Sequence, residues 1–294
     1  MKKNKKILIT GGAGFVGTNL IKFFLNKTNY YIISIDDYSS GFKKNHLKNK
    51  RVKYIKGSTK DISKLIKRPG EIKTVFHFGE FARIYQSFLK MNECIESNSV
   101  GSNSVFNFCL KNKIKLIYSA TSASLGNKGN DKNLSPYAFT KAKNLELLEN
   151  LKKWFNFKYE VIYFYNVYGP HQICRGQMST VIGIFEDHYK KRKLLPVVRP
   201  GTQTRRFTHI DDTIKICFLA WKKNLCRHYS ISNKKSYSII EVAKLFKSKI
   251  KYLPKRAGER YASALIDKNL SNKIYKYFGK ISLKNYIQSF IKNG

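Results

Sequence analysis

A tyrosine and a lysine four positions apart are the residues of this chain best suited to acid–base chemistry. Tyr137 and Lys141 lie in the segment Ser135-Pro136-Tyr137-Ala138-Phe139-Thr140-Lys141. Proline favours the first turn of a helix, so the segment predicts a helix start with Tyr137 and Lys141 on one face. An ammonium group near a phenol favours the phenolate and lowers the phenol's pKa from its usual value of about 10. The pair therefore predicts a general base that works at neutral pH.

Hydroxyl side chains precede this pair at the end of a predicted strand, 116–120. Thr121 and Ser122 follow that strand directly. Hydroxyls at the carboxyl end of a parallel strand face the crevice where such sheets bind ligands. We expect Thr121 or Ser122 to hydrogen-bond a substrate hydroxyl and to relay its proton to Tyr137. The alternative for some of these hydroxyls is a turn or a helix cap.

A glycine-rich turn near the N-terminus predicts a site for a dinucleotide. The predicted strand 6–10 runs into Gly11, Gly14 and Gly17, and a helical pattern follows. Glycine lacks the Cβ atom that would hold a pyrophosphate away, and the helix dipole favours the anion. Asp36 ends the next strand about 20 residues later and can accept both ribose hydroxyls of an adenosine. No basic residue directly follows Asp36 to bind a 2′-phosphate, so NAD is favoured over NADP as the cofactor.

The elements that must position these residues alternate along the first half of the chain. Continuously apolar strands separated by helices are typical of a parallel sheet covered on both faces. After Gly169-Pro170 the pattern is more irregular, which indicates a smaller lobe. We predict an α/β, doubly wound parallel sheet in residues 1–170 and a substrate-binding lobe in 171–294, with some chain crossing back near 205–232. The predicted strands are 6–10, 31–36, 52–55, 74–78, 116–120 and 159–165, and the predicted helices are 14–27, 94–111 and 136–156.

The charge of the chain raises the question of a polyanionic partner. Of the 294 residues, 57 are Lys or Arg and 18 are Asp or Glu, so the formal net charge is +39. Specific phosphate and base recognition favours Arg, whereas only 11 of these basic residues are Arg. Because the Lys excess is spread along the chain, we interpret it as compositional and predict no nucleic acid or membrane partner. A catalytically silent protein bound to nucleic acid or membrane is the alternative from another class.

The patterns of cysteine, histidine and apolar residues argue against a disulfide-stabilised, a metal-binding and a membrane-spanning protein. The five cysteines are odd in number and show no CxxC or Cys/His ligand spacing, which argues against disulfides and zinc. No acidic or histidine cluster has metal spacing, so we predict no metal. We interpret His77 as a satisfied core residue and His209 as a helix cap. No apolar run approaches the roughly 18 residues of a membrane span, and we expect a cytoplasmic protein.

Together these motifs resemble the extended short-chain dehydrogenases/reductases that act on nucleotide sugars. The resemblance covers nearly the whole chain and rests on residues 10–17, Asp36, residues 75–79, Asn98, Thr121, Tyr137 with Lys141, residues 165–170, 203–207 and 256–259. It implies a Rossmann sheet, a tightly held NAD and a nucleoside-diphosphate sugar in the C-terminal lobe. It also implies a homodimer paired through the helices near 94–111 and 136–156.

Matching motif by motif, the resemblance implies two sets of binding residues. Lys141 would hold the nicotinamide ribose, Asn166 would contact the sugar diphosphate, and Arg205 with Arg256 would clamp it. Ser58 stands where an Asp commonly contacts adenine, and a small Ser263 would leave room for a 2-acetamido group. The implied cofactor contacts are Gly11, Gly14, Phe15, Val16, Gly17, Asp36, Ser58, Phe78, Gly79, Asn98, Tyr137 and Lys141. The implied substrate contacts are Thr121, Tyr137, Asn166, Arg205, Arg256, Glu259 and Ser263.

The chemistry of this family divides at the residue after the hydroxyl. The 4,6-dehydratases and decarboxylases carry a Glu there, whereas this chain has Ser122 and Ala123. C4 epimerases need no such acid, so the resemblance implies an NAD-dependent epimerase of UDP-hexoses or UDP-N-acetylhexosamines, in the carbohydrate metabolism that serves cell-surface polysaccharides. The alternative is a 4,6-dehydratase that uses Glu80 or another acid. We interpret Glu80 and Arg83 as an ion pair, with contact to the substrate as the alternative.

Overall fold

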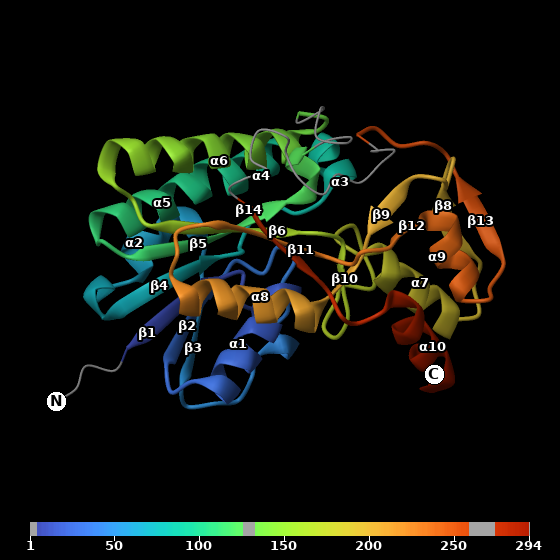
Figure 1. Ribbon diagram of the computed structural model, residues 1–294, viewed down its shortest axis with the longest axis horizontal. Coiled ribbons are helices and arrows are strands. Elements are labelled where there is room, and N and C mark those ends of the chain that lie inside the picture. Colours follow the sequence, from blue (N-terminus) through green and yellow to red (C-terminus); the bar gives the residue numbers. More distant parts are fainter. Residues whose placement is uncertain (1–4, 126–132, 259–273, 294) are drawn as a thin grey trace.

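An eight-stranded, wholly parallel sheet forms the centre of the computed structural model, which describes residues 5–125, 133–258 and 274–293 (Figure 1). The strand order is β14-β11-β6-β5-β4-β1-β2-β3. Helices cover both faces, so the predicted α/β, doubly wound fold is confirmed. The strands of the sheet are β1 (Lys6–Thr10), β2 (Tyr31–Asp36), β3 (Val52–Lys56), β4 (Ile72–His77), β5 (Lys115–Thr121), β6 (Tyr159–Phe164), β11 (His228–Ser232) and β14 (Ile274–Phe278).

The six strands predicted for the first half of the chain are all present, with bounds that differ by at most two residues at either end. The central strand β1 shows why the apolar runs of the sequence form strands. Its Ile7, Leu8 and Ile9 are fully buried, as a strand covered on both faces requires. Parallel pairing on both sides, with β2 and with β4, then brings all the carboxyl ends to one edge of the sheet.

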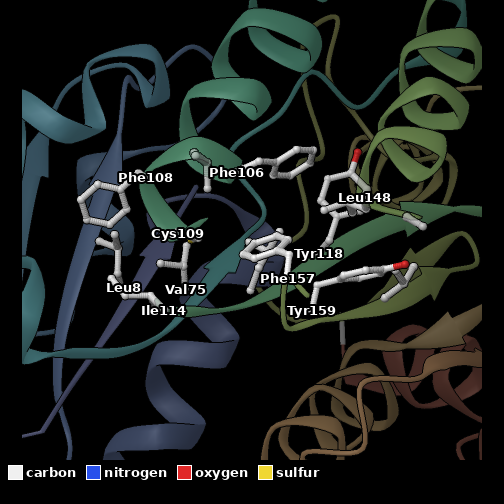
Figure 2. Packing of buried hydrophobic residues seen from close by; sticks show 14 of the residues in the cluster. Leu8, Val75, Phe106, Phe108, Cys109, Ile114, Tyr118, Leu148, Phe157 and Tyr159 are labelled. Carbon is white, nitrogen blue, oxygen red and sulfur yellow. The ribbon is translucent and has the colours of Figure 1, made fainter. Parts of the chain in front are cut away.

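Two helical layers enclose the sheet (Figure 1). On one face lie α2 (Ile62–Leu65), α4 (Met91–Ile95), α5 (Ser102–Lys111) and α6 (Pro136–Phe155), and on the other lie α1 (Phe15–Lys27) and α8 (Ile210–Lys223). Figure 2 shows the core beneath the first layer, where Phe106, Tyr118 and Leu148 are fully buried. His209 precedes α8, and its ring accepts a hydrogen bond from the Asp211 N–H, which confirms the predicted cap.

The predicted helix 94–111 is not one regular helix. The structure has α4, then a π-helical stretch at Glu96–Gly101, then α5. The wider turn places Asn98 in the interior, where its side chain bonds both the N–H and the C=O of Phe81. A Cβ atom on Gly101 would lie 2.4 Å from the Thr59 hydroxyl. Such contacts with distant segments override the helical periodicity on which the prediction was based.

The C-terminal lobe has its own core and is assembled from separate stretches of chain. It contains α7 (Val181–Lys190), β8 (Leu195–Val198), β9 (Thr204–Arg206), β12 (Ser236–Ser238), α9 (Ile239–Leu245), β13 (Ile250–Leu253) and α10 (Leu283–Asn293). Its core includes the buried Phe185, Val242 and Phe246. Between these elements the chain returns to the large sheet as α8 and β11, and later as β14. The shorter elements are α3 (Ile84–Leu89), which lies between β4 and α4, and the strands β7 (Val167–Tyr168) and β10 (Thr208–His209), which pair with each other. Within the described ranges, no helix has the length and apolar character needed to cross a membrane.

His77, the last residue of β4, is a satisfied core residue, as predicted. Its side chain is fully buried, and both ring nitrogens are bonded. The Thr10 hydroxyl accepts the N–H groups of Phe78 and Gly79, so its own proton points to His77 Nδ1, 2.8 Å away. Nε2 is left as the donor to the Ser102 hydroxyl at 2.9 Å. Burial lowers the pKa of His77 to about 4, so the ring is neutral at pH 7.

The buried neutral state of His77 predicts a pH-dependent stability. Below pH 6.5 the unfolded imidazole takes up a proton that the folded one, with a pKa of about 4, does not. The free energy of unfolding should therefore fall by roughly 3 kcal/mol between pH 7 and pH 4 through this group alone. His77→Gln keeps an acceptor and a donor but cannot titrate. Urea unfolding measures the free energy of unfolding of both proteins across this pH range. The difference between the two free energies should change by that amount, and a difference that stays constant would contradict the assignment.

Candidate functional site

A cavity of about 770 Å³ lies along the edge where the parallel strands end. Its walls come from the turn after β1, the ends of β2 to β6, the first turn of α6 and the loop that precedes α7. This is the edge at which doubly wound sheets bind ligands. Of the residues predicted for cofactor and catalysis, the cavity is lined by Gly11, Gly14, Phe15, Val16, Gly17, Asp36, Ser58, Phe78, Gly79, Tyr137 and Lys141.

The glycine turn leaves no room for side chains. Gly11 has φ +71°, and a Cβ atom there would lie 2.8 Å from the backbone of Gly79. A Cβ atom on Gly17 would lie 2.2 Å from the Gly11 carbonyl oxygen. Helix α1 starts beyond Gly14 with no side-chain cap, so the positive end of its dipole meets the cavity wall. The turn thus fits a dinucleotide pyrophosphate, as the sequence predicts.

Asp36 lies at the end of β2, where the cavity reaches the second and third strands. Its two carboxylate oxygens accept the N–H groups of Ala13 and Tyr38, each at 2.9 Å. Each oxygen can accept one further donor, as two ribose hydroxyls require. Burial raises the pKa of Asp36. The neighbouring lining residues Asp37 and Ser39 carry no positive charge for a 2′-phosphate, so the residues present fit NAD.

Tyr137 and Lys141 lie on the first turns of α6 and both line the cavity. The Ser135 hydroxyl caps the helix by accepting the Ala138 N–H at 3.1 Å, and Pro136 occupies its first turn. Local sequence therefore fixes where the helix starts and which face carries the pair. The backbone N–H of Tyr137 donates to the Ser87 hydroxyl at 3.2 Å, which attaches α6 to α3.

The ammonium group of Lys141 is buried and bonded on two sides. Nζ forms an ion pair with the carboxylate of Glu80 and lies 2.5 Å from the carbonyl oxygen of Ser119 on β5. It also lies 4.7 Å from the centre of the Tyr118 ring. Burial lowers the pKa of Lys141, and the negative charge of Glu80 acts against that shift.

The interpretation of Glu80 and Arg83 as an ion pair is wrong. Glu80 pairs with Lys141, and no ion pair of Arg83 occurs between described residues. The Arg83 guanidinium instead donates from Nε and one terminal nitrogen to the Met178 carbonyl, at 2.9 and 2.5 Å. Spacing along the chain favoured Arg83 as the partner, whereas the packing of α6 against β5 brings Lys141 to Glu80. Arg83 remains a half-buried cation in the cavity wall near Tyr137.

Six of the described predicted site residues lie outside the set that lines the cavity: Asn98, Thr121, Ser122, Asn166, Arg205 and Arg256. Asn98 is buried and fastens the loop after β4 through its bonds with Phe81. The Thr121 hydroxyl accepts the Ala123 N–H at 3.1 Å, and Ser122 is buried in the turn that follows. Asn166 donates to the Arg206 carbonyl at 3.1 Å. The structure therefore brings Tyr137 and Lys141 together with the glycine turn, whereas the side chains of Asn98, Thr121 and Asn166 bond backbone groups of the protein and do not line the cavity.

The residues expected at the sugar diphosphate lie towards the C-terminal lobe. Arg205 is buried on β9, where one terminal nitrogen donates to the Thr204 carbonyl at 2.9 Å. The guanidinium of Arg256 lies over the Tyr85 ring, 5.0 Å from its centre. Glu259 and Ser263, the remaining two predicted contacts, fall outside the described residues.

Several cavity residues were not predicted from the sequence. Ser119 supplies the carbonyl that holds Lys141 and stands two residues before Thr121, the hydroxyl that was predicted. Its place at the end of β5 was a signal that could have found it. Phe164, Ile173, Gln177 and Met178 also line the cavity. Phe164 is the last residue of β6 and the other three lie in the loop before α7, where no motif marks them.

A glycine turn, an acidic strand end and a Tyr–Lys pair on one parallel sheet define a dinucleotide-dependent enzyme site. Residues 7–232 match the family model described as the NAD dependent epimerase/dehydratase family, and the chain belongs to that family. The cofactor of the family is NAD, and the chain is an NAD-dependent epimerase/dehydratase of the extended short-chain dehydrogenase/reductase type.

Relatives within this family carry different activities. The chain is 26% identical over 257 residues to the ADP-L-glycero-D-manno-heptose-6-epimerase of Brachyspira hyodysenteriae, covering 82% of this chain and 80% of that protein. It is 27% identical over 257 residues to the human dTDP-D-glucose 4,6-dehydratase, covering 82% and 72%. The UDP-glucuronic acid 4-epimerase of Bacillus cereus, solved with UDP-glucuronic acid and NAD, is 25% identical, with a TM-score of 0.82 and coverage of 98% and 99%.

The glycine turn allows a direct test of the cofactor site. Gly17→Ala places a methyl group against the Gly11 carbonyl, and the turn must shift away from the phosphate position. We expect NAD affinity to fall about tenfold or more, equivalent to about 1.4 kcal/mol. Gly70→Ala is the matched control, because no atom lies within 4 Å of a Cβ atom there. Calorimetric titration of NAD into the cofactor-free proteins measures both, and equal affinities would contradict the assignment.

Proposed function

We propose that this protein is an NAD-dependent C4 epimerase of nucleoside-diphosphate sugars, of the UDP-hexose or UDP-N-acetylhexosamine type. The observation that carries the proposal is that Tyr137 and Lys141 share a cavity wall with the glycine turn, while the adjoining carboxylate of Glu80 is committed to Lys141. Bound NAD would accept a hydride from C4 of the sugar and return it to the other face of the transient ketone. The remaining requirements fall on side chains of this chain.

Tyr137 acts as the general base in this proposal. Tyr137 lines the cavity, and 8% of its surface is exposed. A sugar hydroxyl can therefore reach it while bulk water is largely excluded. Tyr137 takes the proton of the C4 hydroxyl and later returns it, which is the whole proton cycle of an epimerisation. Lys141 lies one helical turn further on and supplies the positive charge that favours the phenolate. Thr121 remains the proposed hydroxyl relay.

The environment of Glu80 supports an epimerase over a dehydratase. A 4,6-dehydratase needs a carboxyl group that exchanges a proton with the sugar, and the positions after Thr121 hold Ser122 and Ala123. Glu80 is the acid that might have replaced it in the alternative prediction. Its side chain is 2% exposed, and both oxygens are bonded to other side chains. Glu80 borders the cavity, but a carboxylate whose oxygens are already bonded to Lys141, Ser102 and Tyr118 is poorly suited to exchange a proton with a ligand there.

The C-terminal lobe supplies the substrate contacts in this proposal. Arg205 and Arg256 carry guanidinium groups, which suit the paired oxygens of a diphosphate better than Lys does. Support for a diphosphate sugar as the ligand comes from the family and from the Bacillus cereus relative solved with UDP-glucuronic acid.

Product analysis separates the epimerase from its alternative. We expect incubation with UDP-glucose, UDP-N-acetylglucosamine or UDP-glucuronic acid to give a C4 epimer. Its mass should be unchanged, because epimerisation inverts the configuration at C4 and neither adds nor removes an atom. Mass spectrometry with chromatographic separation of the epimers measures this. A product lighter by one water would identify a dehydratase instead, and GDP- and dTDP-sugars complete the panel.

Removal of the phenol tests the base. Tyr137→Phe should fold and retain NAD, yet lose about 10²- to 10⁴-fold in kcat, because the proton of the C4 hydroxyl has no acceptor. Tyr168→Phe is the control. It removes a buried hydroxyl that donates to the Ile281 carbonyl and lies in the core of the C-terminal lobe, outside the cavity lining. Turnover by Tyr137→Phe close to that of the unsubstituted enzyme would show that another group is the base.

A further inference from the structure

We propose that Glu80 is a positioning residue of the catalytic centre: it fixes the Lys141 ammonium and balances its charge, and so sets the pH range in which Tyr137 works. This inference rests on the proposed function, because it assigns a partner to the Tyr–Lys pair of the same site. Glu80 acts through Lys141 and has no contact with the reacting atoms. Its place in the chain is the first loop after β4, three residues after His77.

The first step of the argument is that Glu80 holds Lys141 in one place. The Lys141 ammonium bonds one oxygen of Glu80 and the carbonyl of Ser119, and it faces the Tyr118 ring. The side chains of Lys141 and Glu80 are 4% and 2% exposed. A flexible lysine is thereby restricted to a single arrangement in the cavity wall that it shares with Tyr137.

The second step is that Glu80 is itself held from three sides. Its other oxygen accepts the Ser102 hydroxyl at 2.8 Å, the Tyr118 hydroxyl at 3.0 Å and the Asn144 amide at 3.3 Å. These three residues come from α5, β5 and α6. Ser102 in turn accepts the His77 Nε2–H. The carboxylate therefore cannot follow Lys141 if the lysine moves, and the pair has a fixed position relative to the sheet.

The third step concerns charge. The titratable groups that face the pair are His77 on β4, Cys94 on α4 and Tyr118 on β5, and Tyr118 in turn faces Tyr137 on α6. Burial keeps His77 neutral with a pKa of about 4, and it keeps the Cys94 thiol neutral with a pKa of about 11. The pKa of Tyr118 lies well above its ordinary value for the same reason. At neutral pH the ammonium of Lys141 is thus balanced by Glu80.

This balance has a consequence for the base. An uncompensated ammonium in a buried site would favour the phenolate of Tyr137 more strongly, but it would also lose its own proton more readily. Glu80 weakens the effect of Lys141 on the Tyr137 phenol and keeps the Lys141 ammonium protonated. Arg83, which lies near Tyr137, adds a second positive charge on the cavity side. Without Glu80, activity should therefore both begin and end at lower pH.

Glu80→Gln tests the proposal because it keeps the shape of the side chain and removes its charge. We expect both limbs of the pH profile of kcat to move to lower pH by about one unit or more, which corresponds to a tenfold change in each protonation equilibrium. The matched control is Glu160→Gln. Glu160 forms another buried pair, with Lys115 at the start of β5, away from the cavity lining.

The control separates positioning from plain stability. Both variants remove the charge of a buried carboxylate from a Glu–Lys pair, so both should lower the melting temperature. Only Glu80→Gln should move the pH profile. A Glu80→Gln profile that superimposes on that of the unsubstituted enzyme, beside a lowered melting temperature, would overturn the proposal. If Glu80→Gln does not fold, Ser102→Ala loosens the carboxylate by one bond, and it should shift the profile in the same direction by a smaller amount. No shift in Ser102→Ala would then overturn it.

A second measurement keeps this proposal separate from the epimerase assignment. Labelling of Lys141 by acetic anhydride, followed by mass spectrometry of the peptide, reports the fraction of neutral amine at each pH without any turnover. In Glu80→Gln, labelling should begin at lower pH than in the unsubstituted protein. If the unsubstituted protein converts no nucleotide sugar, the proposed function fails, and this measurement alone decides the role of Glu80. An unchanged labelling profile would overturn that role.

Discussion

The close approach of two backbones, at the ends of β1 and β4, is the constraint on which the site depends. Gly11 and Gly79 lie so near each other that a side chain on either would meet the other's main chain at 2.8 Å. The Thr10 hydroxyl joins the same two strands by accepting two N–H groups after β4 and donating to His77. This junction fixes the start of α1, where the phosphates of NAD fit, relative to the loop that carries Glu80. Cofactor binding and the Tyr–Lys pair are therefore set by one contact between neighbouring strands.

From that junction a continuous set of hydrogen bonds leads to Lys141. It runs from Thr10 through His77 and Ser102 to Glu80, and from Glu80 to Lys141. His77 is neutral and Lys141 is charged, so each member has a defined donor or acceptor role. Buried polar groups are costly unless they are bonded, and a fully bonded set specifies one arrangement. The site is thus ordered by the core of the sheet, and the proposed chemistry of Tyr137 and Lys141 depends on that order.

The sequence predicted the parts of this structure that local rules determine. Apolar runs and the glycine turn specify β1, β2 and α1, and Ser135 with Pro136 specifies the start of α6, so the wall that carries Tyr137 and Lys141 could be predicted. The partner of Glu80 could not be predicted in this way, because Lys141 lies 61 residues away along the chain. The π-helical turn at Asn98 was missed for the same reason, since its cause is a bond to Phe81 in another segment. Nearness in sequence favoured Arg83, whereas the packing of α6 on the sheet decided the pairing.

The return of the chain to the large sheet has a mechanical consequence. After entering the C-terminal lobe, the chain comes back as α8 and β11, leaves again for β12 to β13, and comes back once more as β14 before it ends in α10. Strand β14 pairs along the whole of β11, from His228 to Ser232. Opening the lobes as two rigid bodies would have to bend each of these crossings at once. These repeated crossings therefore restrain the relative motion of the two parts more than a single connection would.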